Sequence, residues 1–351
     1  MNTTESAIVL GGTHDKSFAI GAFLASFFDV NPHIETDVVV FHDGMDSRVQ
    51  AAISCLCKGL CRFIRYDSPF EVDVEWHANV DFFTTMVFSK YECLRLLDEY
   101  STVIWFDYDM IVSDSLDSLF LPVSGGMRAI LAPNIGYSIP DNPKHGDLNA
   151  LRECSGIHSP CLAFYKTLDN TRALYEWCIN ATREYASDLV CPDQVVLSAM
   201  VNRFKIDVYP LVFELYSPHP KDRGSRLTDR YVKIWHSYRD VKYWDSDFYD
   251  EDWTRYYCAF LSKYLEQTHG IQITTFLDSG DKGEITAWGQ ASRNDDKAVL
   301  HGCCFPINHV PLTHQAIEHL LCVGATAEAE VLRRALDRRA PFGHANKGVR
   351  Q

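Results

Sequence analysis

The stretch TVIWF at Thr102–Phe106 is followed at once by Asp107, Tyr108 and Asp109. We interpret it as a buried β-strand, because it is a continuous run of apolar and β-branched residues that ends at an acid. Other strand-like runs lie at residues 7–12, 36–42, 61–66, 128–132, 208–213 and 231–235. Their alternation with helix-like segments predicts an α/β domain with a largely parallel sheet.

The helix-like segments carry apolar residues at spacings of three and four. In the first two-thirds of the chain they are residues 17–28, 47–60, 82–100, 171–186 and 193–201. Further on, the strand pattern fades, and helices are predicted only at residues 256–265 and 315–336. We therefore expect an α/β domain over residues 1–254 and a mainly helical extension of unassigned role over residues 255–351.

The composition excludes several classes of protein. The chain has 351 residues, 46% of them hydrophobic, and a net charge of -14, which disfavours binding to a nucleic-acid backbone. It contains no apolar run of the roughly 18 residues that a membrane span needs, and residues 1–6 lack the basic flank of a secretory signal. We expect a cytoplasmic protein. The basic residues between 333 and 350 suit either weak contact with an anionic membrane surface or a solvated helix face.

The cysteines do not indicate a disulfide framework, because 12 of them are few for a chain of this length. Several lie in apolar helix patterns, as Cys93 and Cys178 do, and are expected to be buried free thiols. The group Cys55, Cys57 and Cys61 has no C-x-x-C pair and no second half-site. A structural zinc ion is therefore not favoured there.

The acids after the TVIWF run are the leading candidates for chemistry. Ligand sites in α/β sheets lie beyond the carboxyl ends of strands. There, Asp107 and Asp109 can offer oxygen ligands to a hard divalent cation such as Mn²⁺ or Mg²⁺. Two other D-x-D patterns, at residues 245–247 and 250–252, have no apolar strand ahead of them. The alternative for the first pair is a turn or a helix cap.

The first strand-like run ends in Gly11 and Gly12, followed by Thr13. Small residues there let the backbone approach a nucleotide. The segment is neither a G-x-G-x-x-G fingerprint nor a P-loop, which argues against a dinucleotide enzyme and a P-loop ATPase. Asp15 and Phe18 are candidates for contact with the base and ribose, although Phe18 also suits a core position.

Four stretches of the chain occur in the same order as the motifs of a known protein family. They are VIWFDYDMIVSDSLDSLF at residues 103–120, KYECLRLLDEY at 90–100, PDQVVL at 192–197 and IWHSYRDVKYW at 234–244. Together they resemble the motifs of family 8 glycosyltransferases, the group that includes glycogenin and bacterial lipopolysaccharide galactosyltransferases. The resemblance covers residues 7–245.

The resemblance implies a GT-A fold, in which a Rossmann-like nucleotide-binding core has a mixed, mostly parallel sheet. It also implies a nucleotide sugar donor, commonly a UDP-sugar, an acceptor hydroxyl, Mn²⁺ or Mg²⁺, and retention of anomeric configuration. The implied metal ligands are Asp107, Asp109 and His236. The candidate donor-binding residues, from the resemblance and from the residues themselves, are Gly11, Gly12, Thr13, Asp15, Lys90, Asp107, Tyr108 and Lys242. The resemblance places Asp193 on the donor sugar and Gln194 near the anomeric carbon.

The electrostatics of sugar transfer agrees with the roles that the resemblance implies. Sugar transfer leaves negative charge on the departing diphosphate, so a metal ion and a lysine aimed at those oxygens stabilise it. A satisfied loop histidine and a solvated lysine remain the alternatives for His236 and Lys242, and a simple helix start remains the alternative for Asp193 and Gln194.

The chain departs from the family pattern at two places. Arg239 and Tyr243 replace a glycine and a proline of the last motif, and residues 158–161 (HSPC) stand where the family has an asparagine-glycine turn. These changes affect the expected donor-sugar pocket, so the resemblance does not identify the sugar that is transferred. A metal-dependent nucleotidyltransferase and a non-catalytic nucleotide-sugar-binding protein are the rival functions.

Overall fold

A computed structural model describes residues 4–70, 84–238, 241–244, 248, 250–269, 272–279 and 285–292. The chain divides into two compact units, Met1–Tyr238 and Arg239–Gln351. The division into domains at residue 254 stays a prediction.

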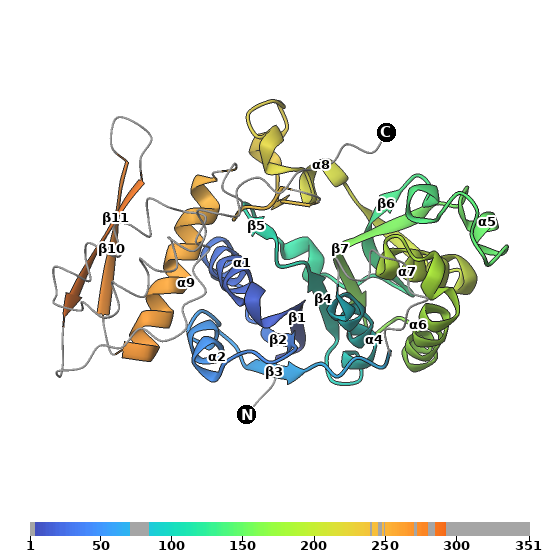
Figure 1. The fold of residues 1–351 in the computed structure, drawn as a ribbon, viewed down its shortest axis with the longest axis horizontal. Helices are drawn as coiled ribbons and strands as arrows, with labels where there is room; N and C mark the ends of the chain where they lie inside the picture. Colours follow the sequence, from blue (N-terminus) through green and yellow to red (C-terminus); the bar gives the residue numbers. More distant parts are fainter. Residues whose placement is uncertain are drawn as a thin grey trace, which may run out of the picture. The chain divides into compact units, whose positions relative to one another are not determined.

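The first unit is built on a seven-stranded sheet with the order β3-β2-β1-β4-β7-β6-β8 (Figure 1). Its strands are β1 (Ser6–Gly12), β2 (Asp37–His42), β3 (Cys61–Arg65), β4 (Thr102–Phe106), β6 (Gly126–Ala132), β7 (Gly156–Tyr165) and β8 (Asp207–Leu211). β1, β2, β3 and β4 run parallel, whereas β7 runs antiparallel to both β4 and β6. β6 and β8 pair in parallel. The mixed, mostly parallel sheet predicted from the sequence is confirmed.

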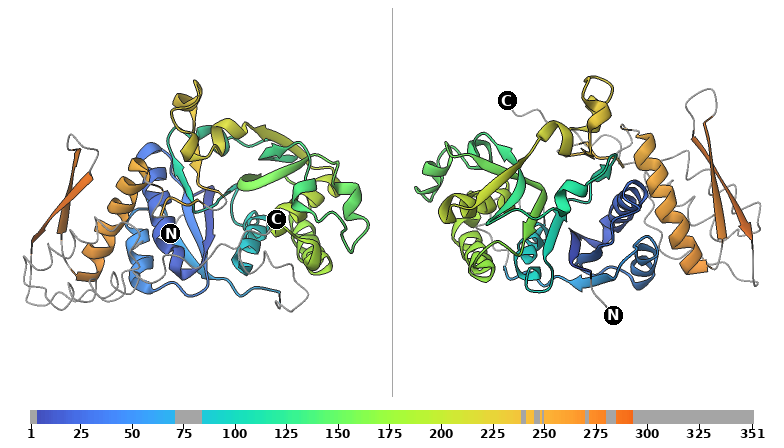
Figure 2. Two further views of the ribbon diagram at one scale, coloured as in Figure 1. Left: turned by 45° about the horizontal axis from the view of Figure 1, so that its top comes forward. Right: turned by 180° about the vertical axis from the view of Figure 1, so that it is seen from behind.

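Helices cover both faces of this sheet (Figure 2). The longer ones are α1 (Ser17–Val30), α2 (Ser47–Ser54), α6 (Thr171–Tyr185) and α7 (Pro192–Phe204). Successive side chains of a strand point to opposite faces. In β4, Phe106 therefore packs against Phe23 of α1, with ring centroids 5.1 Å apart, whereas Trp105 belongs to the core cluster that includes residues of α6 and α7. Burial on both faces explains why β1 and β4 are apolar throughout.

Two predicted helices are shorter than expected. Residues 82–100 were predicted as one long helix, which is wrong: the described part contains a 3-10 helix, η2 (Thr85–Tyr91), and a short α4 (Glu92–Leu96). Five side chains of η2 are buried, so it is not an amphipathic surface helix. The helix predicted at residues 47–60 ends at Ser54.

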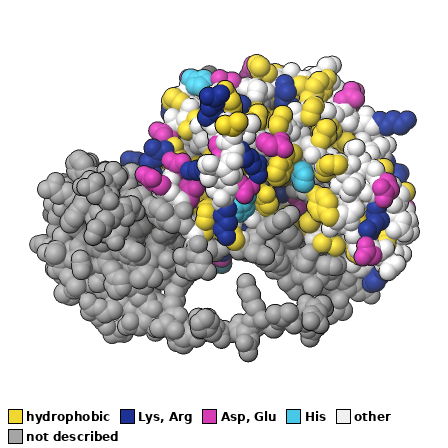
Figure 3. Space-filling view, turned by 90° about the horizontal axis from the view of Figure 1, so that it is seen from above, with side chains coloured by type: hydrophobic (Ala, Val, Ile, Leu, Met, Phe, Trp, Pro, Cys, Tyr) yellow, Lys and Arg dark blue, Asp and Glu magenta, His cyan; other side chains and the backbone are white. Residues whose placement is uncertain are grey.

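The remaining short elements of the first unit lie along its loops. They are η1 (His14–Lys16), β5 (Met110–Val112), η3 (Asp117–Phe120), η4 (Gly136–Ser138), α5 (Leu148–Leu151), η5 (Ala186–Asp188), α8 (Phe213–Tyr216), η6 (Pro220–Asp222), η7 (Asp229–Tyr231) and β9 (Ile234–His236). β5 and β9 form a separate two-stranded antiparallel sheet. In Figure 3, hydrophobic and charged side chains intermix on the face seen from above, as is usual for a water-exposed surface.

The second unit contains α9 (Glu251–His269) and the antiparallel hairpin of β10 (Gln272–Ser279) and β11 (Ile285–Ser292). Trp253 of α9 stacks on Tyr257, with centroids 5.2 Å apart. The hairpin was not predicted, and the helix predicted at residues 315–336 lies outside the described residues, as do the basic residues beyond 333. None of the helices that the structure describes is long and apolar enough to cross a membrane.

Candidate active site

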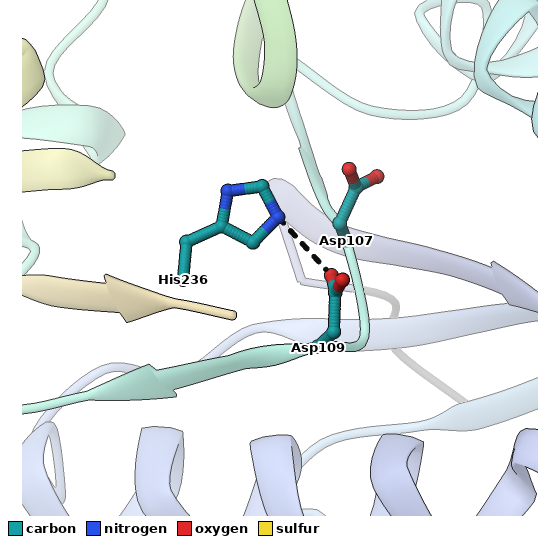
Figure 4. Close-up of side chains that lie close together, drawn as sticks. All are labelled: Asp107, Asp109 and His236. Atoms are coloured by element: carbon teal, nitrogen blue, oxygen red, sulfur yellow. Dashed lines mark ion pairs between the residues drawn. The ribbon is translucent and has the colours of Figure 1, made fainter. Parts of the chain in front are cut away.

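Asp107, Asp109 and His236 come together at the carboxyl end of β4 (Figure 4). Each side chain offers one ligand atom, and the three atoms lie within 4.8 Å of one another. Asp109 and His236 are buried, whereas Asp107 is half-buried. A carboxylate in such a place is costly unless it is paired or binds a cation. The geometry therefore fits a divalent metal site made of two carboxylate oxygens and one imidazole nitrogen.

Strand pairing explains how a histidine so far along the chain reaches these acids. Directly after Asp109 the chain enters β5, which pairs antiparallel with β9, so that Met110 lies opposite His236. The backbone N–H of Ser237 donates to the carbonyl oxygen of Asp109 at 2.9 Å. The backbone of β9 thus fixes His236 beside the acidic pair.

Neighbouring groups hold Asp107 and His236. The Trp105 indole N–H donates to Asp107 Oδ1 at 2.8 Å, and the Asp107 backbone N–H donates to the carbonyl oxygen of Pro160 at 2.9 Å. The hydroxyl of Ser217 lies 2.9 Å from Nδ1 of His236. This contact leaves Nε2 of His236 facing Asp109, at 3.2 Å from Oδ1. Such partners orient metal ligands in many proteins.

Lys90 forms ion pairs with two acids, Asp107 of the candidate metal site and Asp193 of α7. Its Nζ is 3.1 Å from Asp107 Oδ1 and 2.7 Å from Asp193 Oδ2, and the side chain is only 5% exposed. Burial by itself lowers the pKa of Lys90, but the negative charges of Asp107 and Asp193 raise it above its ordinary value. Lys90 is therefore a fixed positive charge inside the site. The donor contact predicted for Lys90 stays a prediction.

Asp193 and Gln194 lie in the first turn of α7, as the sequence predicts, and both are buried. Asp193 Oδ2 accepts a hydrogen bond from Ser159 Oγ at 2.6 Å in addition to its ion pair with Lys90. The amide nitrogen of Gln194 donates to the hydroxyl of Tyr137 at 2.6 Å and to Ser138 Oγ at 3.0 Å. Helix capping alone does not account for Asp193 and Gln194, because both side chains are held by partners outside α7.

Gly11 and Gly12 end β1 directly beside β4. A Cβ on Gly11 would lie 2.7 Å from the ring of Trp105 and would also overlap the hydroxyl of Ser89, so only glycine fits there. A Cβ on Gly12 would come within 3.2 Å of Tyr108. Since Trp105 holds Asp107, the end of β1 is packed against the acidic motif.

Thr13 and Asp15 follow in the next turn. Thr13 Oγ1 donates to Asp15 Oδ1 at 2.5 Å, and Lys16 Nζ lies 2.8 Å from Asp15 Oδ2. Burial by itself raises the pKa of Asp15, but these hydrogen bonds lower it on balance. Burial and the nearby acids raise the pKa of Tyr108, so its hydroxyl stays protonated. Phe18 is buried in the core.

Lys242 belongs to the second unit. The role predicted for it at the diphosphate stays a prediction. Of the two other D-x-D patterns, residues 245–247 lie outside the described residues, whereas residues 250–252 lie at the start of α9.

Sequence reasoning missed β7, although this strand organises the site. Opposite β6, the register jumps from Ala129 facing Leu162 to Ile130 facing His158. The segment between Leu162 and His158 therefore bulges out of the ladder with β6, while Cys161 still pairs with Phe106 of β4. Bulges of this kind redirect side chains beside functional sites. The available signal was Pro160, because a proline within a strand marks an edge or a bulge.

Residues at and beside the bulge meet different parts of the site. His158 Nδ1 lies 3.1 Å from the hydroxyl of Tyr137, Ser159 bonds Asp193, and the carbonyl oxygen of Pro160 accepts from Asp107. The segment whose sequence departs from the family pattern thus connects the acidic motif to the start of α7.

This fold and this acidic site define a glycosyltransferase of the GT-A class. Residues 7–124 match the family model described as "Glycosyl transferase family 8", so the resemblance is confirmed and this part of the chain is a family 8 domain. No curated protein matches the chain.

Solved structures agree on the fold. The galactosyltransferase LgtC, in complex with donor and acceptor sugar analogs, is 15% identical with a TM-score of 0.56, over 73% of this chain and 95% of LgtC. The bifunctional glycosyltransferase WbbM, in its apo form, is 12% identical with a TM-score of 0.53, over 75% of this chain and 50% of WbbM. At these identities the likeness carries the fold alone.

Proposed function

We propose that this glycosyltransferase moves a sugar from a nucleotide diphosphate donor, most simply a UDP-sugar, to an acceptor hydroxyl with retention of anomeric configuration. The convergence of Asp107, Asp109 and His236 is the observation that carries the proposal. It provides a place for a metal ion at the strand end where α/β proteins bind ligands. Retention follows from the family resemblance, and LgtC, which has the same fold, was solved with donor and acceptor sugar analogs.

We propose Mn²⁺ or Mg²⁺ as the cation, held by Asp107, Asp109 and His236. Carboxylate oxygens suit both ions, and an imidazole ligand favours Mn²⁺ over Mg²⁺. When bound, such an ion supplies positive charge that stabilises the leaving diphosphate. The hydroxyl of Ser217 keeps His236 turned toward the site.

The protein's own side chains then act on the donor sugar. Asp193 is buried at the start of α7 with Lys90 and Ser159 on the same carboxylate oxygen, which leaves Oδ1 to accept from a sugar hydroxyl. Gln194, the next residue, presents an amide at the same helix end. A carbonyl dipole there stabilises positive charge on the anomeric carbon as the bond to the diphosphate breaks.

Thermal unfolding with UDP tests the metal and nucleotide together. Selective binding to the native state raises the melting temperature, because ligand at about 100 times its Kd adds about 2.7 kcal/mol. We expect UDP with Mn²⁺ to stabilise the protein and UDP with EDTA to stabilise it far less. Equal stabilisation with and without Mn²⁺ would count against the metal site.

Transfer is tested with UDP-glucose and UDP-galactose, with Mn²⁺, by the release of UDP. Asp109→Asn is expected to lower kcat by a factor of about 100 or more, the scale of losing one strong electrostatic element. Asp114→Asn is the matched control, because Asp114 is half exposed and pairs with Lys233. Near-normal UDP release by Asp109→Asn would remove these residues from the mechanism. Release of pyrophosphate from UTP instead would favour a nucleotidyltransferase.

A further inference from the structure

Residues 219–231, between α8 and β9, form a loop that projects from the first unit, in yellow at the top of Figures 1 and 2. The loop contains the short η6 and η7. Leu227 is 97% exposed and Tyr231 is 53% exposed. Single exposed leucines are common in soluble proteins, so the surroundings of Leu227 decide what its exposure means.

The two acids of this loop hold its shape. Asp229 Oδ2 accepts hydrogen bonds from the backbone N–H groups of Gly224 and Arg226, at 2.5 and 3.3 Å. Asp222 Oδ2 accepts from the guanidinium group of Arg226 at 2.6 Å. Both acids are half-buried. Their negative charges are thus used within the loop, and their hydrogen bonds stabilise the turn that exposes Leu227.

The exposed charged residues of the loop are all basic. They are Lys221 and Arg230, and the guanidinium carbon of Arg230 lies 4.6 Å from the ring centroid of Tyr231. A third cation, Arg223, anchors the loop on β9, where its guanidinium carbon lies 4.8 Å from the ring centroid of Trp235. The loop therefore presents a basic and apolar surface in a chain whose net charge is -14.

A negatively charged protein can bind a negatively charged membrane through such a loop, because salt limits the reach of each charge. At physiological ionic strength, exposed charges are largely screened beyond about 8 Å. Acids farther away than this therefore oppose contact only weakly, whereas Lys221 and Arg230 act on the lipid phosphates directly. Each basic residue near an anionic leaflet strengthens binding by about fivefold.

We propose that the loop at residues 219–231 docks this glycosyltransferase on a membrane surface rich in anionic lipid. Leu227 enters the boundary between headgroups and acyl chains, while Lys221 and Arg230 contact lipid phosphates. Tyr231 then lies at the level of the headgroups, where amphipathic aromatic rings are favoured. An anionic polymer would also attract the two cations, but it offers no apolar phase to Leu227. Docking of this kind is independent of the donor sugar and of the metal ion.

The first test is sedimentation of the full chain with vesicles at physiological ionic strength. We expect binding to vesicles made of phosphatidylglycerol and phosphatidylcholine in equal parts, and little binding to phosphatidylcholine alone. Leu227→Asp should lower the affinity for the mixed vesicles by about tenfold or more, because the inserted side chain is lost and a negative charge is added. Leu121→Asp is the matched control, since Leu121 is 62% exposed and precedes β6, outside the loop. It should bind like the wild type.

The second test reverses a charge. Arg230→Glu should lower the affinity for mixed vesicles by about fivefold or more, whereas Arg172→Glu on α6, where the side chain is 87% exposed, should change it little. Melting temperatures without vesicles should match the wild type, because all these side chains are exposed. Loss of binding in Arg230→Glu together with normal binding in Leu227→Asp would indicate an anionic polymer and overturn the proposal. Equal binding by every variant would assign the contact to other residues and would also overturn it.

The third test locates the inserted residue. Leu227→Trp keeps an apolar side chain and adds a fluorescent probe, whose emission is obtained by difference from the wild type and its seven tryptophans. With mixed vesicles that carry brominated acyl chains, the added emission should shift to shorter wavelength and be quenched, because the indole ring enters the acyl boundary. The added emission of Leu121→Trp should stay unquenched. An unshifted and unquenched signal in Leu227→Trp would overturn the proposal, even if the protein sediments with the vesicles.

Discussion

The ammonium nitrogen of Lys90 lies 2.7 Å from a carboxylate oxygen of Asp193 and 3.1 Å from one of Asp107. One buried cation thus joins the acidic motif after β4 to the start of α7. Removing a partner from a buried ion pair leaves an uncompensated charge, which is more damaging than the pair itself is stabilising. Lys90 therefore sets both the stability and the charge of the site.

We predict that Lys90→Met lowers the free energy of unfolding by about 3–5 kcal/mol, measured by urea denaturation at pH 7. Arg172→Met is the control, because the Arg172 to Glu176 pair is exposed, and its loss should cost about 0.5 kcal/mol or less. The pKa of folded Lys90 lies above its ordinary value of 10.5, so its contribution is complete below pH 10.5 and is lost as pH rises through the folded pKa. The deficit of the variant should therefore stay constant from pH 7 to 9. A deficit no larger than that of the control would contradict this reading.

Ser217→Ala should weaken metal binding without removing a ligand. The Ser217 hydroxyl contacts Nδ1 of His236 at 2.9 Å, and loss of such an outer partner typically costs about 10- to 100-fold in metal affinity. Titration of Mn²⁺ in the presence of UDP, followed by melting temperature, measures the change. Ser54→Ala on the exposed side of α2 is the control. Unchanged Mn²⁺ affinity in Ser217→Ala would mean that His236 does not bind the ion.

Part of this site could be predicted from the sequence because strands β1 and β4 are continuous apolar runs, and the residues after such runs must lie at a sheet edge. The sequence alone therefore predicts that Gly11 and Asp107 lie at this edge of the sheet. His236 could be assigned to the site only through the family resemblance, because β9 has three residues and shows no periodic pattern in the sequence. Its pairing with β5 is non-local.

β7 could not be predicted for a different reason. His158, Ser159 and Pro160 interrupt its apolar pattern at the bulge, where side chains are turned toward partners in the site rather than into a regular ladder. In η2, the polar residues Ser89 and Lys90 are buried among apolar residues. The sequence pattern of this 3-10 segment therefore resembles that of an α-helix. The misread segments are those in which tertiary contacts of the site outweigh local propensity.

Gly11→Ala tests the packing between β1 and the acidic motif. An added Cβ would lie 2.7 Å from Trp105, whose indole holds Asp107. We predict a loss of stability of about 1–3 kcal/mol, the cost of overpacking, together with weaker Mn²⁺ binding. Gly146→Ala is the matched control, because no atom lies within 4 Å of the Cβ that it would add. Urea denaturation and Mn²⁺ titration give the two readouts, and equal behaviour of both variants would exclude the predicted clash.

Asp188 provides a test at acid pH away from the metal group. Its buried carboxylate accepts from the backbone N–H groups of Lys144 and His145, at 3.0 and 2.9 Å, and contacts the His145 ring. Burial by itself raises the pKa of Asp188, but these hydrogen bonds lower it below 3.8 on balance. A lowered folded pKa means that the stabilisation is present above the unfolded value near 3.8 and is lost as pH falls through the folded pKa.

We predict that Asp188→Asn costs about 1–3 kcal/mol at pH 7, because an amide oxygen cannot satisfy all these donors. The difference from the wild type should shrink as pH falls below 3.8, because the unfolded carboxylate then binds a proton that the folded carboxylate binds only at its lower pKa. Urea midpoints between pH 3 and 7 measure this, with the exposed Asp169→Asn as control. A difference that stays the same down to pH 3 would show that the charge of Asp188 does not hold the segment at residues 144–145, and that the variant acts through packing alone.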